Sequence, residues 1–264
     1  MTDIGRGFGR EAFGADPANY DAARPGYPDW VFEALRGVRA LGPGSAVFEI
    51  GAGTGKATRR LLQLGADPLV AIEPDPRLAA FLRQACDAPA LTVQNVPFEA
   101  VDLPEAAFDL GFAATSFHWL DEDAALPKIR RLLRPGAWWA AAWHVFGDPE
   151  RQDHFHQATV RLFEGAPGSP SAGAGGVAYA LDAPRRLAAL ARAGFEAQPP
   201  RLDRWELVLN PQELVALYAT YSNVEARADR AELLAALARI ARDQFGGRVT
   251  RNMITVLYLA RRRA

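Results

Sequence analysis

Three glycines directly after a short apolar run are the residues of this sequence that point most clearly to a ligand. Gly51, Gly53 and Gly55 follow Ala46–Ile50, a run typical of a buried strand, and a helical pattern of apolar residues begins at Ala57. Glycine lets the backbone approach a ligand closely, and a helix N-terminus favours anionic groups. The spacing therefore predicts a ligand-binding loop between a strand and a helix.

The residues of this loop distinguish between the nucleotide classes that such loops hold. A nucleoside-triphosphate loop ends in Gly-Lys-Ser/Thr, but Ala57 follows Lys56 here and Ile50 occupies the position of the required first glycine. A dinucleotide loop, Gly-x-Gly-x-x-Gly, would place its third glycine at Lys56. The triphosphate interpretation fails on both counts, and a nicotinamide-dependent oxidoreductase stays open as a weaker alternative.

The elements that must position this loop follow a regular rhythm of short apolar runs and amphipathic helices. This alternation predicts an α/β fold, a Rossmann-like seven-stranded and mostly parallel sheet with helices on both faces. Helix starts are predicted at Asp182, at Asn210-Pro211, and at Asp229, where Glu232 would complete a capping box. The predicted strands are 46–50, 69–72, 91–93, 108–113, 137–143, 201–209 and 253–259.

An acidic residue two positions before the first glycine completes a longer motif. Glu49 with the three glycines forms acidic-x-Gly-x-Gly-x-Gly, which resembles the first motif of class I S-adenosylmethionine-dependent methyltransferases. Glu73, at the end of the second predicted strand, and Val96–Glu99, after the third, resemble the ribose and adenine motifs of that family. The resemblance implies S-adenosyl-L-methionine as the cofactor. It assigns the following residues to cofactor binding: Tyr20, Arg24, Glu49, Gly51, Ala52, Gly53, Thr54, Gly55, Glu73, Pro74, Phe98, Glu99 and Thr115.

Further segments are similar to a small-molecule subgroup of the family, akin to bacterial trans-aconitate methyltransferases. These are Tyr20–Pro28, Thr115–Asp121 and Arg134–Gly136. The resemblance implies that the last strand, Met253–Leu259, is antiparallel, and that a small-molecule acceptor receives the methyl group by in-line displacement. It implies the following acceptor-binding residues: Tyr27, His118, Trp119 and His144.

His118 is the candidate catalytic residue, because a histidine after the fourth strand could deprotonate a hydroxyl or an amine. Several of these residues also have simpler interpretations. His118 could be a wall residue bonded to backbone, Phe98 could be core, and Arg24 could form a surface salt bridge. Glu49 lies inside an apolar strand, where an unpaired carboxylate is costly, so we expect it to face loop amides or the cofactor's amino-acid moiety. His154 and His156 point apart on a helical pattern, so no metal site is expected.

We expect one methyltransferase domain over residues 1–264. Within it, residues 1–41 would form an N-terminal cover segment and helix, and residues 144–182 an inserted substrate-cap segment. A loop is expected at 165–176, where Gly, Pro, Ser and Ala dominate. No residue pattern predicts an oligomeric state.

Composition excludes several classes of function. Thirty Lys and Arg balance 31 Asp and Glu, which argues against a nucleic-acid partner, as does the absence of an Asn/Asp-Pro-Pro-Tyr/Phe motif after the fourth strand. The single cysteine, Cys86, cannot form an internal disulfide.

The longest apolar run is too short to span a membrane, and the N-terminus lacks the apolar core of a signal peptide, so a cytoplasmic protein is expected. The Ala- and Arg-rich, Lys-poor composition is typical of a bacterium with a GC-rich genome. A non-catalytic cofactor-binding protein of the same fold remains a second alternative.

Overall fold

A mixed eight-stranded sheet forms the centre of the molecule, in a computed structural model that describes residues 4–5, 7–8, 12–173 and 175–263. Its strand order is β3-β2-β1-β4-β5-β8-β6, with β7 also paired to β8. The first five strands of this order, from β3 through β2, β1 and β4 to β5, are parallel. Strand β8 is antiparallel to β5, β6 and β7. The strands are β1 (Ser45–Ile50), β2 (Ala66–Ile72), β3 (Leu91–Gln94), β4 (Phe108–Ala114), β5 (Leu133–Phe146), β6 (Phe195–Ala197), β7 (Arg201–Leu209) and β8 (Val249–Arg262).

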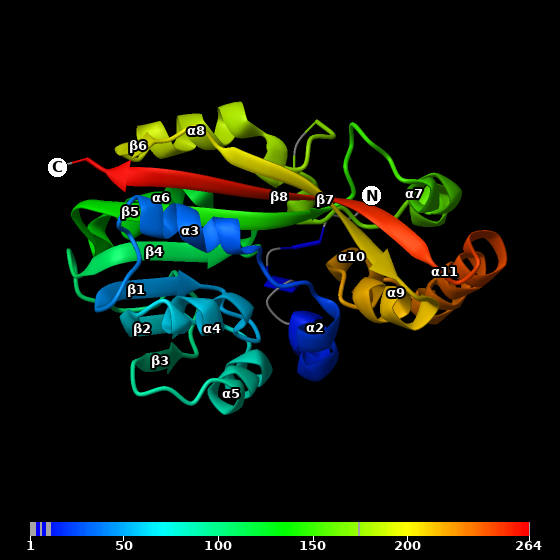
Figure 1. The fold of residues 1–264 in the computed structure, drawn as a ribbon, viewed down its shortest axis with the longest axis horizontal. Coiled ribbons are helices and arrows are strands. Elements are labelled where there is room, and N and C mark those ends of the chain that lie inside the picture. The colour runs from blue at the N-terminus through cyan, green and yellow to red at the C-terminus, as the bar shows by residue number, and fades with distance from the viewer. Residues whose placement is uncertain (1–3, 6, 9–11, 174, 264) are drawn as a thin grey trace.

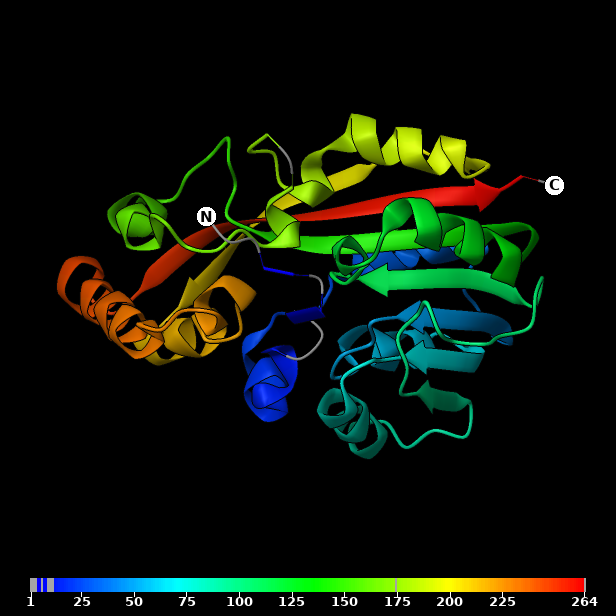
Figure 2. The same cartoon turned by 180° about the vertical axis from the view of Figure 1, so that it is seen from behind.

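Helices cover both faces of this sheet, as Figures 1 and 2 show from opposite sides. Apolar residues of α3 and α4 pack on one face, against side chains such as Leu110 and Phe112. The other face, which includes Phe48 and Trp139, packs against α6 and α8. The helices are η1 (Phe13–Ala15), α2 (Pro17–Ala23), α3 (Asp29–Gly37), α4 (Lys56–Gln63), α5 (Pro76–Ala85), η2 (Phe117–Trp119), α6 (Glu122–Leu132), α7 (His154–Thr159), η3 (Val160–Phe163), η4 (Pro170–Ala172), η5 (Tyr179–Leu181), α8 (Ala183–Arg192), α9 (Pro211–Tyr218), α10 (Ser222–Glu225) and α11 (Arg230–Phe245).

A second, smaller core lies at one end of the sheet, in a set of helices that we call the helical group (α7, α9, α10 and α11). Phe155, Leu214, Leu217 and Leu237 are buried together there. Figure 1 shows the group beyond the carboxyl ends of β1 and β4, joined to the sheet by β7 and β8. The helical group therefore stands beside the edge at which open α/β sheets bind ligands.

The N-terminal segment lies between the sheet and the helical group. Asp21 on α2 pairs with Arg59 on α4 at 2.8 Å. On the other side, the Asn19 amide donates to the carbonyl oxygen of Ala216 on α9 at 3.1 Å. Helix α2 thus connects the glycine-loop helix to the helical group. The first part of the predicted cover segment, residues 1–3, 6 and 9–11, lies outside the described residues.

The predicted fold is confirmed, including the antiparallel last strand, but the strand count was one short. Strand β6 has three residues, too few for a recognisable alternation. Helix α2 was also missed, because Asp16 and Pro17 begin it without an apolar period to mark it. Helices do start after Asp182 and at Asn210, which forms a complete capping box with Glu213.

The capping box predicted at Asp229 and Glu232 is wrong. Helix α11 begins at Arg230, but the Asp229 side chain makes no capping hydrogen bond. Instead its carboxylate accepts two hydrogen bonds from the guanidinium of Arg227, each 2.7 Å long. A charged neighbour competes with the helix N–H groups for the carboxylate, and that competition is invisible in the spacing of the residues.

Candidate active site

The glycine loop turns from β1 into α4 with all three glycines at positive φ, 67°, 59° and 90°. Their surroundings give them different roles. A Cβ added at Gly51 would lie 2.5 Å from Cβ of Ser116, and one added at Gly55 would lie 2.5 Å from Cδ1 of Leu82. A Cβ added at Gly53 would meet nothing within 4 Å. Gly51 and Gly55 therefore allow close packing, whereas Gly53 faces the open space of a cleft.

Glu73 lies across this cleft at the end of β2. Its Oε2 accepts from the backbone N–H of Gly53 at 2.8 Å, and its Oε1 accepts from that of Asp75 at 2.9 Å. Burial raises the pKa of Glu73 to about 7, although both backbone hydrogen bonds oppose the rise. Each carboxylate oxygen can accept a second hydrogen bond, so two further donors could bind here.

Glu49 is buried in β1, with 1% of its surface exposed. Its Oε2 accepts a 2.6 Å hydrogen bond from the Thr58 hydroxyl on α4. Burial, together with a smaller effect of the nearby charge of Glu73, raises the pKa of Glu49 to about 8. The protein partner is thus a hydroxyl on the following helix rather than a loop amide, and the sequence pattern did not single out Thr58.

Two small clefts meet at the glycine loop. The Glu73 cleft is bordered by Pro74, Phe98 and Glu99, and the Glu49 cleft by Arg24, Ala52 and Thr54. Apart from Gly55, every residue that was assigned to cofactor binding borders at least one of the two.

Phe98 packs in the sheet core and also forms part of the wall of a cleft. Its ring is nearly parallel to that of Phe48, with 6.3 Å between the centroids, and it is buried in the sheet core. The same residue borders the Glu73 cleft. Lys128 fixes the segment by donating to the carbonyl oxygens of Phe98 and Val101 at 2.8 and 2.6 Å.

Thr115 stands where the clefts meet a larger cavity, which we call the large cavity. It borders all three and has a φ of 53°, a strained value for a β-branched residue. Its Oγ1 lies 2.5 Å from the Tyr27 hydroxyl and accepts from the His144 backbone N–H at 3.2 Å. The backbone N–H of Thr115 donates to the carbonyl oxygen of Ala142 on β5 at 2.7 Å. These contacts hold the carboxyl end of β4 in its unusual conformation.

Arg24 also borders both the Glu49 cleft and the large cavity. Its Nε donates to Oγ1 of Thr220 at 2.7 Å, and its Nη2 donates to the Thr220 carbonyl oxygen at 2.8 Å. The guanidinium carbon lies 4.8 Å from the centroid of the Phe146 ring. Arg24 is therefore a fixed cation at the junction rather than a surface residue in a salt bridge.

His118 is buried beside the large cavity, and its proton has a defined location. Its Nδ1 accepts a 3.1 Å hydrogen bond from the indole N–H of Trp143. An indole nitrogen can only donate, so the neutral imidazole must carry its proton on Nε2. Burial, together with a smaller effect of the Arg24 charge, lowers the pKa of His118 to about 3. At neutral pH Nε2 is thus a hydrogen-bond donor, which does not suit the expected role as a general base.

His144 is fully engaged by the protein. Its Nδ1 lies 2.9 Å from Oγ1 of Thr255, and its Nε2 lies 3.1 Å from the carbonyl oxygen of Gly26. The Gly26 carbonyl oxygen can only accept, so the neutral ring carries its proton on Nε2 and the Thr255 hydroxyl donates to Nδ1. The Trp205 indole donates to the same Thr255 oxygen at 2.9 Å. The imidazole stacks on Tyr27 at 4.6 Å. The geometry argues against direct acceptor binding by the His144 nitrogens and gives the ring a positioning role.

The large cavity has a volume of about 490 Å³, within the range of small-molecule sites. It is bordered by Trp119, Trp143, Tyr218, Tyr221 and Arg251, and the Tyr221 ring lies 5.1 Å from the Arg24 guanidinium. The predicted cap segment contributes many of its walls, and others come from the N-terminal segment and from the residues after β4. The helical group contributes Tyr218 and Tyr221, and no sequence signal connected these two residues to the site. Phe13, which packs edge-on against Trp119 at 5.7 Å, was also missed.

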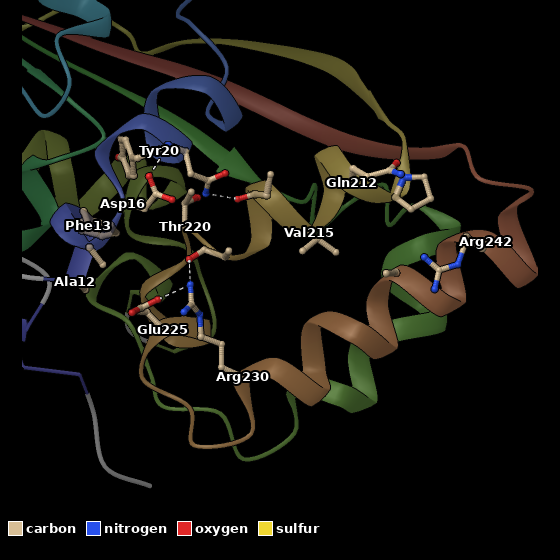
Figure 3. Close-up of a pocket in the computed structure, with 16 residues that line it drawn as sticks. Ala12, Phe13, Asp16, Tyr20, Gln212, Val215, Thr220, Glu225, Arg230 and Arg242 are labelled. Atoms are coloured by element: carbon tan, nitrogen blue, oxygen red, sulfur yellow. Dashed lines mark hydrogen bonds and ion pairs between the residues drawn. The ribbon is translucent and has the colours of Figure 1, made fainter. Parts of the chain in front are cut away.

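A further cavity lies between the N-terminal segment and helices α9 and α11 (Figure 3). Two pairs of its charged groups are engaged: Asp16 accepts from the backbone N–H of Asn19, and Arg230 pairs with Glu225 at 2.9 Å. Among the described residues, Tyr20 and Phe13 alone are common to its lining and that of the Glu73 cleft. The cavity therefore lies behind α2, away from the glycine loop.

The described residues contain neither a metal-binding cluster nor a membrane-spanning helix. No group of three or more His, Cys, Asp or Glu side chains is arranged to hold a metal ion in that part of the chain. None of the helices there combines the length and the apolar character needed to cross a membrane.

Comparison with known proteins relates this geometry to one family. Residues 48–141 match the model of the methyltransferase domain family. An uncharacterized methyltransferase of Mycobacterium tuberculosis is 32% identical over 138 residues, which are 51% of this chain and 52% of the relative. The chain thus spans about half the length of the curated relatives it matches.

Solved structures confirm the fold. The [4+2]-cyclase SpnF aligns over 100% of this chain and 99% of its own, with a TM-score of 0.59 and 16% identity. A Haemonchus contortus phosphoethanolamine N-methyltransferase, in complex with phosphomonomethylethanolamine and S-adenosylhomocysteine, aligns over 95% of this chain and 58% of its own, with a TM-score of 0.56 and 13% identity. The chain has the Rossmann-like methyltransferase fold, which also carries a cyclase.

Proposed function

We propose that this protein is a class I S-adenosylmethionine-dependent methyltransferase that acts on a small molecule. The observation that carries the proposal is the pairing of Glu73 with the Gly53 N–H across a cleft into which Gly53 projects no side chain. The matched domain, residues 48–141, contains the glycine loop, Glu73 and Thr115. Both cofactor clefts are therefore built mainly from the part of the chain that matches the family.

The residues present fit S-adenosylmethionine. Glu73 would accept hydrogen bonds from the two ribose hydroxyls, because each of its oxygens has a free lone pair. Pro74, Phe98 and Glu99 would border the adenine. The Glu49 cleft would hold the methionine part, with Arg24 paired to its carboxylate. Ala52, Thr54 and Thr115 would line the remaining walls.

The bound cofactor would supply an electrophilic methyl group. The chain's own contribution would be alignment and exclusion of water rather than proton transfer. Tyr20 and Thr115 border both cofactor clefts and the large cavity, so they would stand beside the point of transfer. His118 would donate from Nε2 to the acceptor, and Tyr27 and Trp119 would shape the cavity. An acceptor that needs no deprotonation suits such a site.

The expected organisation of the chain supports a small acceptor. We propose that residues 1–41 act as a cover over the cofactor and that residues 144–182 act as a cap over the acceptor, within one domain. Their contribution to the walls of the large cavity supports both roles. The near-zero net charge favours a small molecule over a nucleic acid.

A second candidate is an enzyme or binding protein of this fold that does not transfer the methyl group. The donor character of His118 favours it, because no proton acceptor has been identified for a hydroxyl substrate. Cofactor binding would be the same in both cases. Consumption of S-adenosylmethionine in the presence of candidate acceptors separates them. The nicotinamide alternative is weakened by Lys56, which occupies the position of the third glycine.

Isothermal titration with S-adenosylhomocysteine tests the cofactor assignment. We expect micromolar binding by the wild type, and a loss or strong weakening in Gly53→Arg and Glu73→Ala. Gly246→Arg is the matched control, because Gly246 also has a φ of 59° and open space, but it ends α11 far from the loop. Binding that survives in Gly53→Arg, or that is absent from folded wild type, would overturn the assignment.

A further inference from the structure

The lining of the large cavity is rich in hydrogen-bond donors. Arg24, Arg251 and His118 line it, and among its described lining residues there is no aspartate or glutamate, although Asp153 pairs with Arg251 from outside the lining. Most of its remaining large side chains are aromatic. A cavity of this composition favours an apolar ligand that carries a group rich in hydrogen-bond acceptors.

Arg251 is the guanidinium of the large cavity that borders neither of the two cofactor clefts. It lies on β8 with 5% of its surface exposed, and its Nε donates to both carboxylate oxygens of Asp153, at 3.1 and 3.0 Å. Its Nη1 donates to the hydroxyl of Tyr218. The Asp153 oxygens also accept from the backbone N–H groups of His156 and Asn252. The carboxylate is thus well satisfied, while a guanidinium has five N–H groups, so Arg251 keeps donors for a ligand.

A phenol group of the same cavity points to the same chemistry. The hydroxyl group of Tyr221 is buried and has no hydrogen-bond partner among the described residues. Tyr221 lines the large cavity. Burial raises the pKa of the Tyr221 phenol above the usual range, so the hydroxyl keeps its proton and can donate. A buried donor without a partner is costly, and a bound acceptor oxygen removes that cost.

We infer that the acceptor is a mainly apolar molecule with one oxyanion, and that Arg251 binds this oxyanion with help from Tyr221. The inference rests on the proposed function and deepens it by naming the class of acceptor. A carboxylate and a phosphate monoester share the required chemistry, because both present acceptor oxygens to a guanidinium.

The wild-type test uses titration of the protein saturated with S-adenosylhomocysteine. The probes are 6-phenylhexanoate, 6-phenylhexyl phosphate, the uncharged amide 6-phenylhexanamide, the cation 6-phenylhexylamine and the compact polyanion citrate. We expect at least one of the two long anions to bind about tenfold or more tightly than the amide, the amine and citrate. The stronger of the two long anions identifies the oxyanion. Equal binding of anion and amide, or preference for citrate, would overturn the inference.

Variants locate the effect at Arg251. The double variant Arg251→Gln/Asp153→Asn removes both charges together, and the new amide oxygen at 153 can still accept from the His156 N–H. It should lose the preference for the anion over the amide, while Arg251→Lys should retain part of it. Tyr221→Phe should weaken anion binding several-fold. The matched control is Arg204→Gln/Asp148→Asn, another Arg–Asp pair with a buried carboxylate, at 2.8 Å and outside the cavity lining.

The outcomes separate this inference from the proposed function. If S-adenosylhomocysteine binds and the anion preference is absent, or survives in the Arg251→Gln/Asp153→Asn variant, the oxyanion inference fails and the proposed function stands. If S-adenosylhomocysteine does not bind to the folded wild type, the proposed function itself fails. Thermal unfolding of each variant checks that a lost preference does not come from a lost fold.

Discussion

The indole of Trp143 determines which nitrogen of His118 carries the proton. The indole N–H donates to Nδ1 at 3.1 Å, so a neutral His118 has its hydrogen on Nε2. Both side chains line the large cavity, and His118 is buried with a pKa lowered to about 3. His118, whose position in the sequence suggested a general base, is therefore a hydrogen-bond donor at Nε2.

The first prediction concerns this tautomer. Nitrogen NMR of the labelled protein should report His118 as the neutral Nε2–H form throughout pH 5 to 8, because burial disfavours the charged ring. In Trp143→Phe the Nδ1 partner is lost, and the Nδ1–H form should become populated. Free histidine, which titrates near pH 6.5, is the control for an imidazole exposed to solvent. Observation of a doubly protonated His118 at pH 6 would contradict the prediction.

The second prediction concerns stability in acid. His118 has a folded pKa of about 3, below its ordinary value near 6.5, so the unfolded chain binds a proton first as the pH falls. The stabilisation is present above pH 6.5 and is lost as the pH falls toward 3, with a slope of about 1.4 kcal/mol per pH unit at most. Urea unfolding of wild type and His118→Gln should give a difference in free energy that shrinks on acidification. A difference independent of pH would contradict the assigned shift.

The third prediction concerns the pH dependence of cofactor binding. The ionised form of Glu73 accepts ribose hydroxyls better than the protonated form, and its pKa of about 7 means that ionisation increases from pH 6 to 8. Affinity for S-adenosylhomocysteine should rise by about tenfold over that range. Glu73→Gln should bind weakly, and the pH dependence that remains should be the one due to Glu49, whose pKa is about 8. Glu105→Gln, at an exposed ion pair with Arg131, should behave as wild type.

The fourth prediction concerns packing under the site. Gly111 in β4 faces Phe48, and a Cβ at Gly111 would lie 2.4 Å from Cζ of that ring. Gly111→Ala should therefore lower the free energy of unfolding by about 1–3 kcal/mol. Gly37→Ala, at the last residue of α3 with nothing within 4 Å, should be neutral or slightly stabilising. Urea unfolding measures both effects. Equal changes in the free energy of unfolding of the two variants would show that the contact with Phe48 does not cause the loss of stability.

Local patterns predicted those parts of the site that lie close together in the sequence. The glycine loop and Glu73 are recognisable because each follows a buried strand, and parallel strands bring their carboxyl ends together. Even there, the partner of Glu49 was not predicted. Thr58 is nine residues away on the next helix, and only the phase of that helix directs its hydroxyl at the carboxylate.

The parts that could not be predicted depend on contacts between distant segments. Arg24 bonds Thr220 across 196 residues, and Arg251 bonds Asp153 across 98. Neither pair has a spacing rule, because the contacts arise from how the helical group packs against the sheet. The same reason hid Tyr221, whose role is evident only from its unpartnered hydroxyl in the cavity.

The continuity of β8 has a consequence for how molecules enter and leave. This strand pairs with β5 in the sheet and with β7 as far as Val249, beside the helical group (Figure 1). A hinge between the sheet and the helical group would have to break that ladder. Movement of α2 would instead break the Asp21–Arg59 and Arg24–Thr220 contacts, so entry and exit of a bound molecule past α2 would require these two contacts to open.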